Sequence, residues 1–179
     1  GEDKTRQVGK DFFILSFLPI FVSVKEIKGE QSDRVRMKKL VIFDLDGTLL
    51  NTIADLAHST NYALNKLGYP THEVEKYNFM VGNGINKLFE RALPEGEKTE
   101  ENVLRVRNEF VPYYNIHNAD DSRPYPGIPA LLSYLQSASI QIAVASNKYQ
   151  AATEKLVAHY FPEIHFTAVF GQREGVNVK

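Results

Sequence analysis

The sequence of 179 residues contains no cysteine. This excludes disulfide bonds, thiolate catalysis and cysteine-ligated metal sites, and it fits a reducing compartment such as the cytoplasm. The formal net charge is only −1, so no excess of positive charge favours binding to nucleic acid or to an anionic membrane. Internal repeats and low-complexity tracts are also missing. With 43% hydrophobic and 24% charged residues, the composition is typical of a globular protein.

The sequence also lacks an apolar run long enough to cross a membrane. Residues 11–24 are strongly apolar, but they are too few for a membrane-spanning helix and Pro19 interrupts them. Basic residues precede this run as in a signal peptide, yet no cleavage site of small residues follows it. We therefore interpret residues 1–36 as a leader or non-core segment, with Met37 as the natural start of the domain. An added strand or a membrane-associated segment is the alternative.

From Leu40 onwards, the apolar pattern alternates between strands and helices. Short apolar runs predict strands at residues 40–43, 140–145 and 166–170. Periodic apolar positions and capping residues predict helices at 53–67, from Thr71, at 85–93, from Thr99 with a kink or end at Pro112, at 128–135 and at 150–160. Strands that alternate with helices imply right-handed crossovers and a parallel sheet, so an α/β fold is expected.

One helical stretch is too long to be a simple crossover. No strand is predicted between Ile53 and about Asn118. We therefore expect residues 53–118 to form a helical cap inserted behind the first strand, with residues 37–52 and 119–179 forming the core. The acidic pair Asp120–Asp121 precedes a Ser-Arg-Pro linker, which indicates a solvated hinge.

Two aspartates end the first predicted strand, within KLVIFDLDGTLLNT at residues 39–52. Ligands of open parallel sheets bind at the carboxyl ends of the strands, where Asp44 and Asp46 lie. Two such carboxylates repel each other unless a cation lies between them, and Gly47 permits a tight turn close to a ligand. A D-x-D pair alone is often two solvated loop residues. The preceding strand and the following helix cap make this pattern far more specific.

This stretch resembles motif I of the haloacid dehalogenase superfamily, specifically of its phosphatases. The resemblance extends from Met37 to Lys179. The matching segments together look like the phosphoglycolate phosphatase-like branch of this superfamily. It is carried by GNGINKLFERAL (82–93), RPYPGIPALLSYL (123–135), IAVASNK (142–148) and VFGQREGVNVK (169–179). It implies a HAD-like Rossmannoid parallel sheet with an inserted α-helical cap, and hydrolysis of a small phosphorylated metabolite such as phosphoglycolate.

The resemblance also implies roles for three catalytic residues. Asp44 would attack phosphorus and form an aspartyl-phosphate, while Asp46 would protonate the leaving oxygen and then activate water. Lys179 would neutralise the phosphate and the nucleophile. An aspartate at position 46 favours phosphoryl transfer over dehalogenation. Mg²⁺ would bind the Asp44 side chain and the Asp46 backbone carbonyl.

Phosphate-binding residues are implied on both sides of the site. In the core they are Gly47, Thr48, Ser146 and Asn147, although a Ser-Asn pair after a strand is otherwise usually a turn or a cap. In the cap they are Gly82, Asn83 and Gly84, which would form a flexible loop facing the substrate or a plain turn between helices. Lys87 and Arg91 could meet a substrate carboxylate, but a solvated helix face is the simpler interpretation.

The family's fourth motif, an acidic cluster on a further strand, has no counterpart in these 179 residues. We therefore expect a fragment of a longer protein, with an unpaired edge beside the Asp44 strand on the side away from Ser146. Weak Mg²⁺ binding and little turnover are expected from residues 1–179 alone. A phosphosugar mutase of the same superfamily and an inactive phosphate-binding fragment remain as alternatives, and the oligomeric state is left open.

Overall fold

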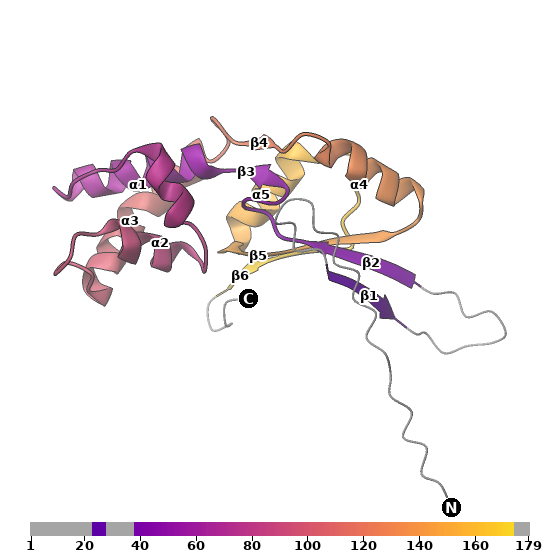
Figure 1. The fold of residues 1–179 in the computed structure, drawn as a ribbon, viewed down its shortest axis with the longest axis horizontal. Helices are drawn as coiled ribbons and strands as arrows, with labels where there is room; N and C mark the ends of the chain where they lie inside the picture. Colours follow the sequence, from indigo (N-terminus) through magenta and orange to yellow (C-terminus); the bar gives the residue numbers. More distant parts are fainter. Residues whose placement is uncertain (1–22, 28–37, 174–179) are drawn as a thin grey trace, which may run out of the picture.

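The computed structural model describes residues 23–27 and 38–173 (Figure 1). Its main sheet has four strands in the order β1-β2-β5-β6. These strands are β1 (Ser23–Ile27), β2 (Lys38–Phe43), β5 (Gln141–Tyr149) and β6 (Ala168–Gln172). The pairs β2–β5 and β5–β6 are parallel, as expected for strands joined by helical crossovers. The predicted α/β fold with a parallel sheet is thus confirmed.

Helices α4 (Ile128–Ser137) and α5 (Gln150–Tyr160) lie on the same side of the sheet (Figure 1). Leu132 and Leu156 are fully buried on these helices and share one apolar cluster with Phe43 and Val144 of the sheet. Burial of this apolar surface is the main force that holds the helices against the strands. The strands are therefore fixed in position up to the point where β2 and β5 end.

The antiparallel strand β1 corrects one expectation. It pairs with β2, so that Ser23 lies opposite Ile42 and Ile27 lies opposite Lys38. The edge of the Asp44 strand that we expected to be unpaired is therefore occupied by residues from the N-terminal segment. The backbone N–H and C=O groups along this edge of β2 therefore pair with β1, as the polar groups of a strand need hydrogen-bond partners.

A block of helices lies between the strands β2 and β5 in the sequence. It contains α1 (Ile53–Lys66), the 3₁₀ helix η1 (Val74–Phe79), α2 (Ile85–Ala92) and α3 (Glu100–His117). We call these residues the helical block. A second apolar cluster, which includes Leu64, Phe89 and Phe110, holds its helices together. The strands β3 (Leu50–Asn51) and β4 (Arg123–Pro124) pair with each other where the chain enters and leaves the block.

One predicted helix is wrong, and one of the two expectations at Pro112 is excluded, each for a local reason. The helix expected from Thr71 is replaced by η1, because the side chain of Asn61 bonds to both the backbone N–H (3.0 Å) and the carbonyl (2.7 Å) of His72. Pro112 does not end α3. It is exposed, while Phe110 and Tyr114 on either side of it are fully buried and anchor the helix. Within the described ranges, no helix is both long and apolar enough to span a membrane.

Candidate active site

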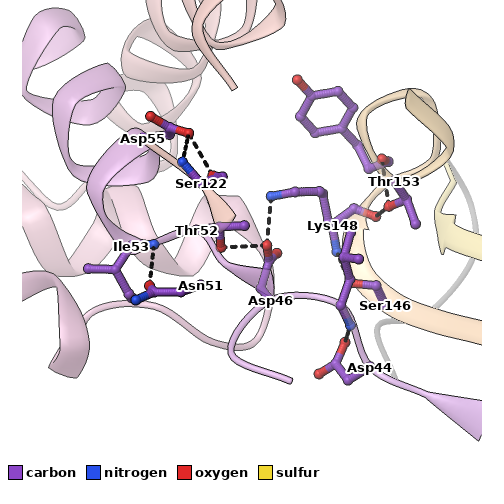
Figure 2. A network of polar contacts seen from close by, with 12 residues as sticks. Asp44, Asp46, Asn51, Thr52, Ile53, Asp55, Ser122, Ser146, Lys148 and Thr153 are labelled. Atoms are coloured by element: carbon purple, nitrogen blue, oxygen red, sulfur yellow. Dashed lines mark hydrogen bonds and ion pairs between the residues drawn. The ribbon is translucent and has the colours of Figure 1, made fainter. Parts of the chain in front are cut away.

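A tight loop directly after β2 presents the two motif aspartates. The backbone N–H groups of Thr48, Leu49 and Leu50 all donate to the carbonyl of Leu45, at 3.0–3.2 Å. Gly47 has a φ of +75°, a conformation that glycine adopts without the strain other residues would suffer. The Leu45 side chain is fully buried and anchors the loop. Asp44 and Asp46, on either side of Leu45, are thereby held at the end of the sheet (Figure 2).

The carboxylate of Asp46 is held by two donors on the same oxygen. Its Oδ1 accepts a hydrogen bond from Thr52 Oγ1 at 2.7 Å and lies 3.0 Å from Lys148 Nζ. The Asp46 side chain is 17% exposed, so it still reaches the cavity described below. Asp44 Oδ1 accepts a hydrogen bond from the backbone N–H of Leu45 at 2.8 Å. Both carboxylates are therefore oriented by the protein before any ligand binds.

The end of β5 supplies the facing residues. The strand was predicted to end at Ala145, but it continues to Tyr149, with an irregular register to β6 between these two residues. Ser146 is buried, and its Oγ accepts a hydrogen bond from the backbone N–H of Lys148 at 3.2 Å. Ser146 and Lys148 are shown beside the aspartates in Figure 2.

Lys148 is a site residue that sequence reasoning missed. Its side chain is only 1% exposed. Burial lowers the pKa of a lysine, but Asp46 and Tyr114 raise it by more, so that the pKa of Lys148 lies above its usual value. Lys148 therefore keeps its positive charge. Burial also raises the pKa of the adjacent Tyr149 to about 12, so this phenol stays neutral.

The loop before α2 faces the two aspartates from the helical block. Gly82, Asn83 and Gly84 all have positive φ values, of 125°, 61° and 84°, which only glycine and a few polar residues adopt readily. Arg91 Nη1 donates to the carbonyls of Met80 (2.7 Å) and Gly82 (3.1 Å). Arg91 thus fixes the shape of this loop, and Lys87 pairs with Glu90 on the helix surface.

One cavity of about 240 Å³ brings most of the predicted residues together. Its polar lining comes from Asp44, Asp46, Gly82, Asn83, Gly84, Ser146, Asn147 and Lys148. A second cavity of about 390 Å³ adjoins it, sharing Asn83, Gly84 and Asn147, and is also lined by Arg107 and Arg173. The site therefore lies between the sheet and the helical block.

Two predicted residues, Gly47 and Thr48, do not line this cavity. Gly47 is exposed in the turn behind Asp46, and the Thr48 side chain is buried below it. Lys179 lies outside the described residues. The predicted roles of all three remain predictions.

A separate group of acidic residues lies where the chain leaves the helical block. Asp55, His58 and Asp121 have ligand atoms within 4.8 Å of one another. However, the buried Asp55 carboxylate already accepts hydrogen bonds from the backbone N–H groups of Asp121 (2.9 Å) and Ser122 (2.8 Å) and from Ser122 Oγ (2.6 Å). Asp55 therefore fastens α1 to the segment that follows α3 (Figure 2).

Gly171 of β6 supports the backbone of Lys148 through close packing. A Cβ atom at Gly171 would lie 2.6 Å from the Lys148 carbonyl oxygen and 2.7 Å from Thr153 Oγ1. We expect Gly171→Ala to lower the free energy of unfolding by about 1–3 kcal/mol, because the backbone must shift to admit the methyl group. Urea denaturation measures this change. Phe170→Ala, at a side chain that is 55% exposed, is the control, and an equal loss in both variants would contradict the prediction.

Comparison with known proteins points to one family. The model of the haloacid dehalogenase-like hydrolase family matches residues 41–179. A phosphoglycolate phosphatase of Agrobacterium fabrum is 35% identical over 136 residues, which cover 75% of this chain and 57% of the relative. The tyrosine-protein kinase PtkA of Mycobacterium tuberculosis is 32% identical over 133 residues, which cover 74% of this chain and 44% of the relative.

The similarity extends to solved structures. One from Lactobacillus delbrueckii subsp. bulgaricus, provisionally described as a phosphoglycolate phosphatase, superposes with a TM-score of 0.70 at 32% identity. The match covers 77% of this chain and 66% of that one. The chain thus spans less than two thirds of the length of each of these three relatives. Because the family model matches well over half of its residues, the chain belongs to the haloacid dehalogenase-like hydrolases.

Proposed function

We propose that this protein hydrolyses a small phosphomonoester, with phosphoglycolate as the first candidate, through a covalent aspartyl-phosphate on Asp44. The cavity of about 240 Å³ supports this most strongly. It brings together two oriented carboxylates, the hydroxyl of Ser146 and the buried ammonium group of Lys148. The phosphoglycolate phosphatases among the relatives support the substrate class. The helical block would act as a cap over the site.

The first step transfers the phosphoryl group to the protein. A carboxylate oxygen of Asp44 attacks phosphorus, and the bond between phosphorus and the ester oxygen breaks. Asp46 donates a proton to the departing oxygen, so that this oxygen leaves as a hydroxyl group and not as an alkoxide. Ser146 and the Gly82–Gly84 loop would hold the phosphate oxygens during this transfer.

The second step regenerates the nucleophile. Asp46, now a carboxylate, accepts a proton from a water molecule as that water attacks the phosphorus of the aspartyl-phosphate. The bond between phosphorus and the Asp44 oxygen breaks, which releases inorganic phosphate. Asp46 ends the cycle with the proton that it donated in the first step, so the reaction is balanced as hydrolysis.

The donors around the cavity also fit a magnesium ion. Asp44 would offer a carboxylate and Asp46 its backbone carbonyl, while Oδ1 of the Asp46 side chain is already used by Thr52 and Lys148. Such hard oxygen ligands suit Mg²⁺. When bound, the ion would reduce the repulsion between the Asp44 carboxylate and the phosphate and stabilise the charge that develops during transfer.

The test is a screen of phosphate release from phosphoglycolate, sugar phosphates, nucleotides and pyrophosphate in the presence of Mg²⁺, with a chain extended beyond Lys179 by the acidic motif that the resemblance implies. Release from phosphoglycolate above the others supports the proposal, and no release from any of them contradicts it. Interconversion of a sugar phosphate without release would favour the mutase instead.

Arg107 and Arg173 in the adjoining cavity are consistent with an anionic substrate.

Asp46→Asn should slow the hydrolysis of esters with poor leaving groups more than the hydrolysis of esters with good ones. An amide cannot donate the proton that an alkoxide needs, whereas p-nitrophenolate leaves without it. We expect kcat to fall by about 10²–10⁴-fold with phosphoglycolate and by clearly less for the first step with p-nitrophenyl phosphate. Single-turnover release of p-nitrophenol separates this step from hydrolysis of the intermediate. Equal losses for both substrates in that step would contradict the assigned role.

A further inference from the structure

The most unusual charge in the site is the buried ammonium group of Lys148. A lysine whose side chain is 1% exposed loses its hydration, at a cost of several kcal/mol unless a partner replaces the water. Among residues 23–27 and 38–173, the only carboxylate that forms an ion pair with it is Asp46, at 3.0 Å. The lysine and the predicted acid–base residue are therefore tied to each other.

The contact uses only one of the two Asp46 oxygens. Both Lys148 Nζ and Thr52 Oγ1 approach Oδ1, and Oδ2 has no hydrogen-bond or ion-pair partner within the described part of the chain. Two donors on one oxygen fix the plane of the carboxyl group and leave the other oxygen available for a proton. Oδ1 can accept these contacts whether Oδ2 carries a proton or not.

Lys148 also contacts the helical block. Its Nζ lies 4.8 Å from the ring centroid of Tyr114, which is a favourable distance for a cation–π interaction. Tyr114 belongs to α3, is fully buried and stacks on Phe110 at 4.9 Å. The ammonium group of Lys148 lies over the Tyr114 ring, and the Tyr114 hydroxyl meets no hydrogen-bond geometry in the part of the chain that the structure describes.

The backbone at Lys148 is fixed from the opposite side. Thr153 Oγ1 of α5 donates to the Lys148 carbonyl at 3.2 Å (Figure 2). The lysine N–H donates to Ser146 Oγ, and Gly171 packs against its carbonyl. The ammonium group therefore projects from a rigid base into the space between Asp46 and Tyr114.

We propose that Lys148 is a positioning residue, which holds Asp46 for proton transfer only while Tyr114 of the helical block covers it. This rests on the proposed function. Contact between the helical block and the sheet would thereby be coupled to the orientation of the acid–base group. Without the lysine, Asp46 retains one donor among the described residues, Thr52, and can rotate about that contact.

The experiment compares Lys148→Met, Lys148→Arg and the control Lys155→Met, each in a chain extended beyond Lys179. Lys155 Nζ also bonds to α3, at the carbonyl of Asn115, but Lys155 has no ion pair with Asp46 in the described ranges. The readouts are kcat and KM for phosphoglycolate, single-turnover p-nitrophenol release from p-nitrophenyl phosphate, and inhibition by inorganic phosphate.

We expect Lys148→Met to lower kcat for phosphoglycolate about 10- to 100-fold, because misplacement by about 1 Å has effects of this size. The loss in p-nitrophenol release should be several-fold smaller, and the inhibition constant of phosphate should change less than threefold. Lys148→Arg should recover part of kcat, and Lys155→Met should keep the wild-type ratio between the two substrates. Tyr114→Leu should reproduce the substrate-dependent loss more weakly, which provides a second test if Lys148→Met fails to fold.

Three results would overturn the inference. These are a loss of equal size for both esters, a loss confined to phosphate affinity, or the same substrate dependence in Lys155→Met. In each of them the wild-type protein still releases phosphate, so the proposed function would stand. A wild-type protein that releases phosphate from neither ester would overturn the proposed function and this inference together.

Discussion

In a chain extended beyond Lys179, Asp44→Asn should abolish phosphate release while the fold remains intact. An amide oxygen is not an anionic nucleophile, so the bond to phosphorus cannot form and no aspartyl-phosphate accumulates. Loss of a covalent nucleophile commonly lowers kcat by a factor of about 10³ or more, and we expect a loss of at least this size. Phosphate release from phosphoglycolate with Mg²⁺ measures it, and circular dichroism checks the fold.

Asp120→Asn is the matched control for this substitution. Asp120 is an exposed carboxylate whose partner is His117, and it does not line the cavity. Its conversion to an amide should change kcat by less than about twofold, an effect too small to indicate a role in the transition state. Turnover of Asp44→Asn near the wild-type level would contradict the assignment of Asp44 as the nucleophile.

Asp55→Ala should cause a large loss of stability. The Asp55 side chain is 1% exposed and accepts three hydrogen bonds, two of them from backbone N–H groups. Removing it leaves these donors without a partner in a buried place, and each hydrogen bond to a charged group contributes about 1.5–3 kcal/mol. Since the contributions are not additive, we expect the free energy of unfolding to fall by about 3–5 kcal/mol in urea denaturation.

The neighbouring carboxylate provides the comparison. Asp121 is 55% exposed and its side chain contacts only His58, at 3.4 Å, among the described ion pairs. Asp121→Asn preserves the backbone N–H that binds Asp55 and should change stability by less than about 0.5 kcal/mol. If both variants lost the same free energy, the buried hydrogen bonds would not be what fastens α1 to the chain after α3.

The order of strands and helices could be predicted because each type of element has its own spacing of apolar residues along the sequence. Helix α5 has the predicted bounds of Gln150 and Tyr160, and Thr99 caps α3 as expected, by accepting a hydrogen bond from the Asn102 N–H. These features depend on neighbours in the sequence. By contrast, η1 departs from the prediction because the side chain of Asn61 in α1 forms hydrogen bonds with the backbone N–H and carbonyl of His72. This contact does not join neighbours in the sequence.

The same distinction separates the site residues that were predicted from the one that was missed. Asp44 and Asp46 have a local signature, a strand followed by D-x-D-G. Lys148 lies within the segment IAVASNK, but its place in that segment does not show that its side chain is buried. Its burial requires Asp46 from β2, Tyr114 from α3 and the extension of β5 beyond Ala145, which only the folded chain brings together.

The pairing of β3 with β4 has a consequence for how this architecture can change. Leu50 lies opposite Pro124 and Asn51 opposite Arg123. The chain therefore enters and leaves the helical block at positions that are hydrogen-bonded neighbours. A segment whose two ends are already neighbours can be lengthened, shortened or exchanged without moving any strand of the main sheet. Grafting another helical insert between Asn51 and Arg123 would therefore alter what covers the aspartates while leaving their scaffold in register.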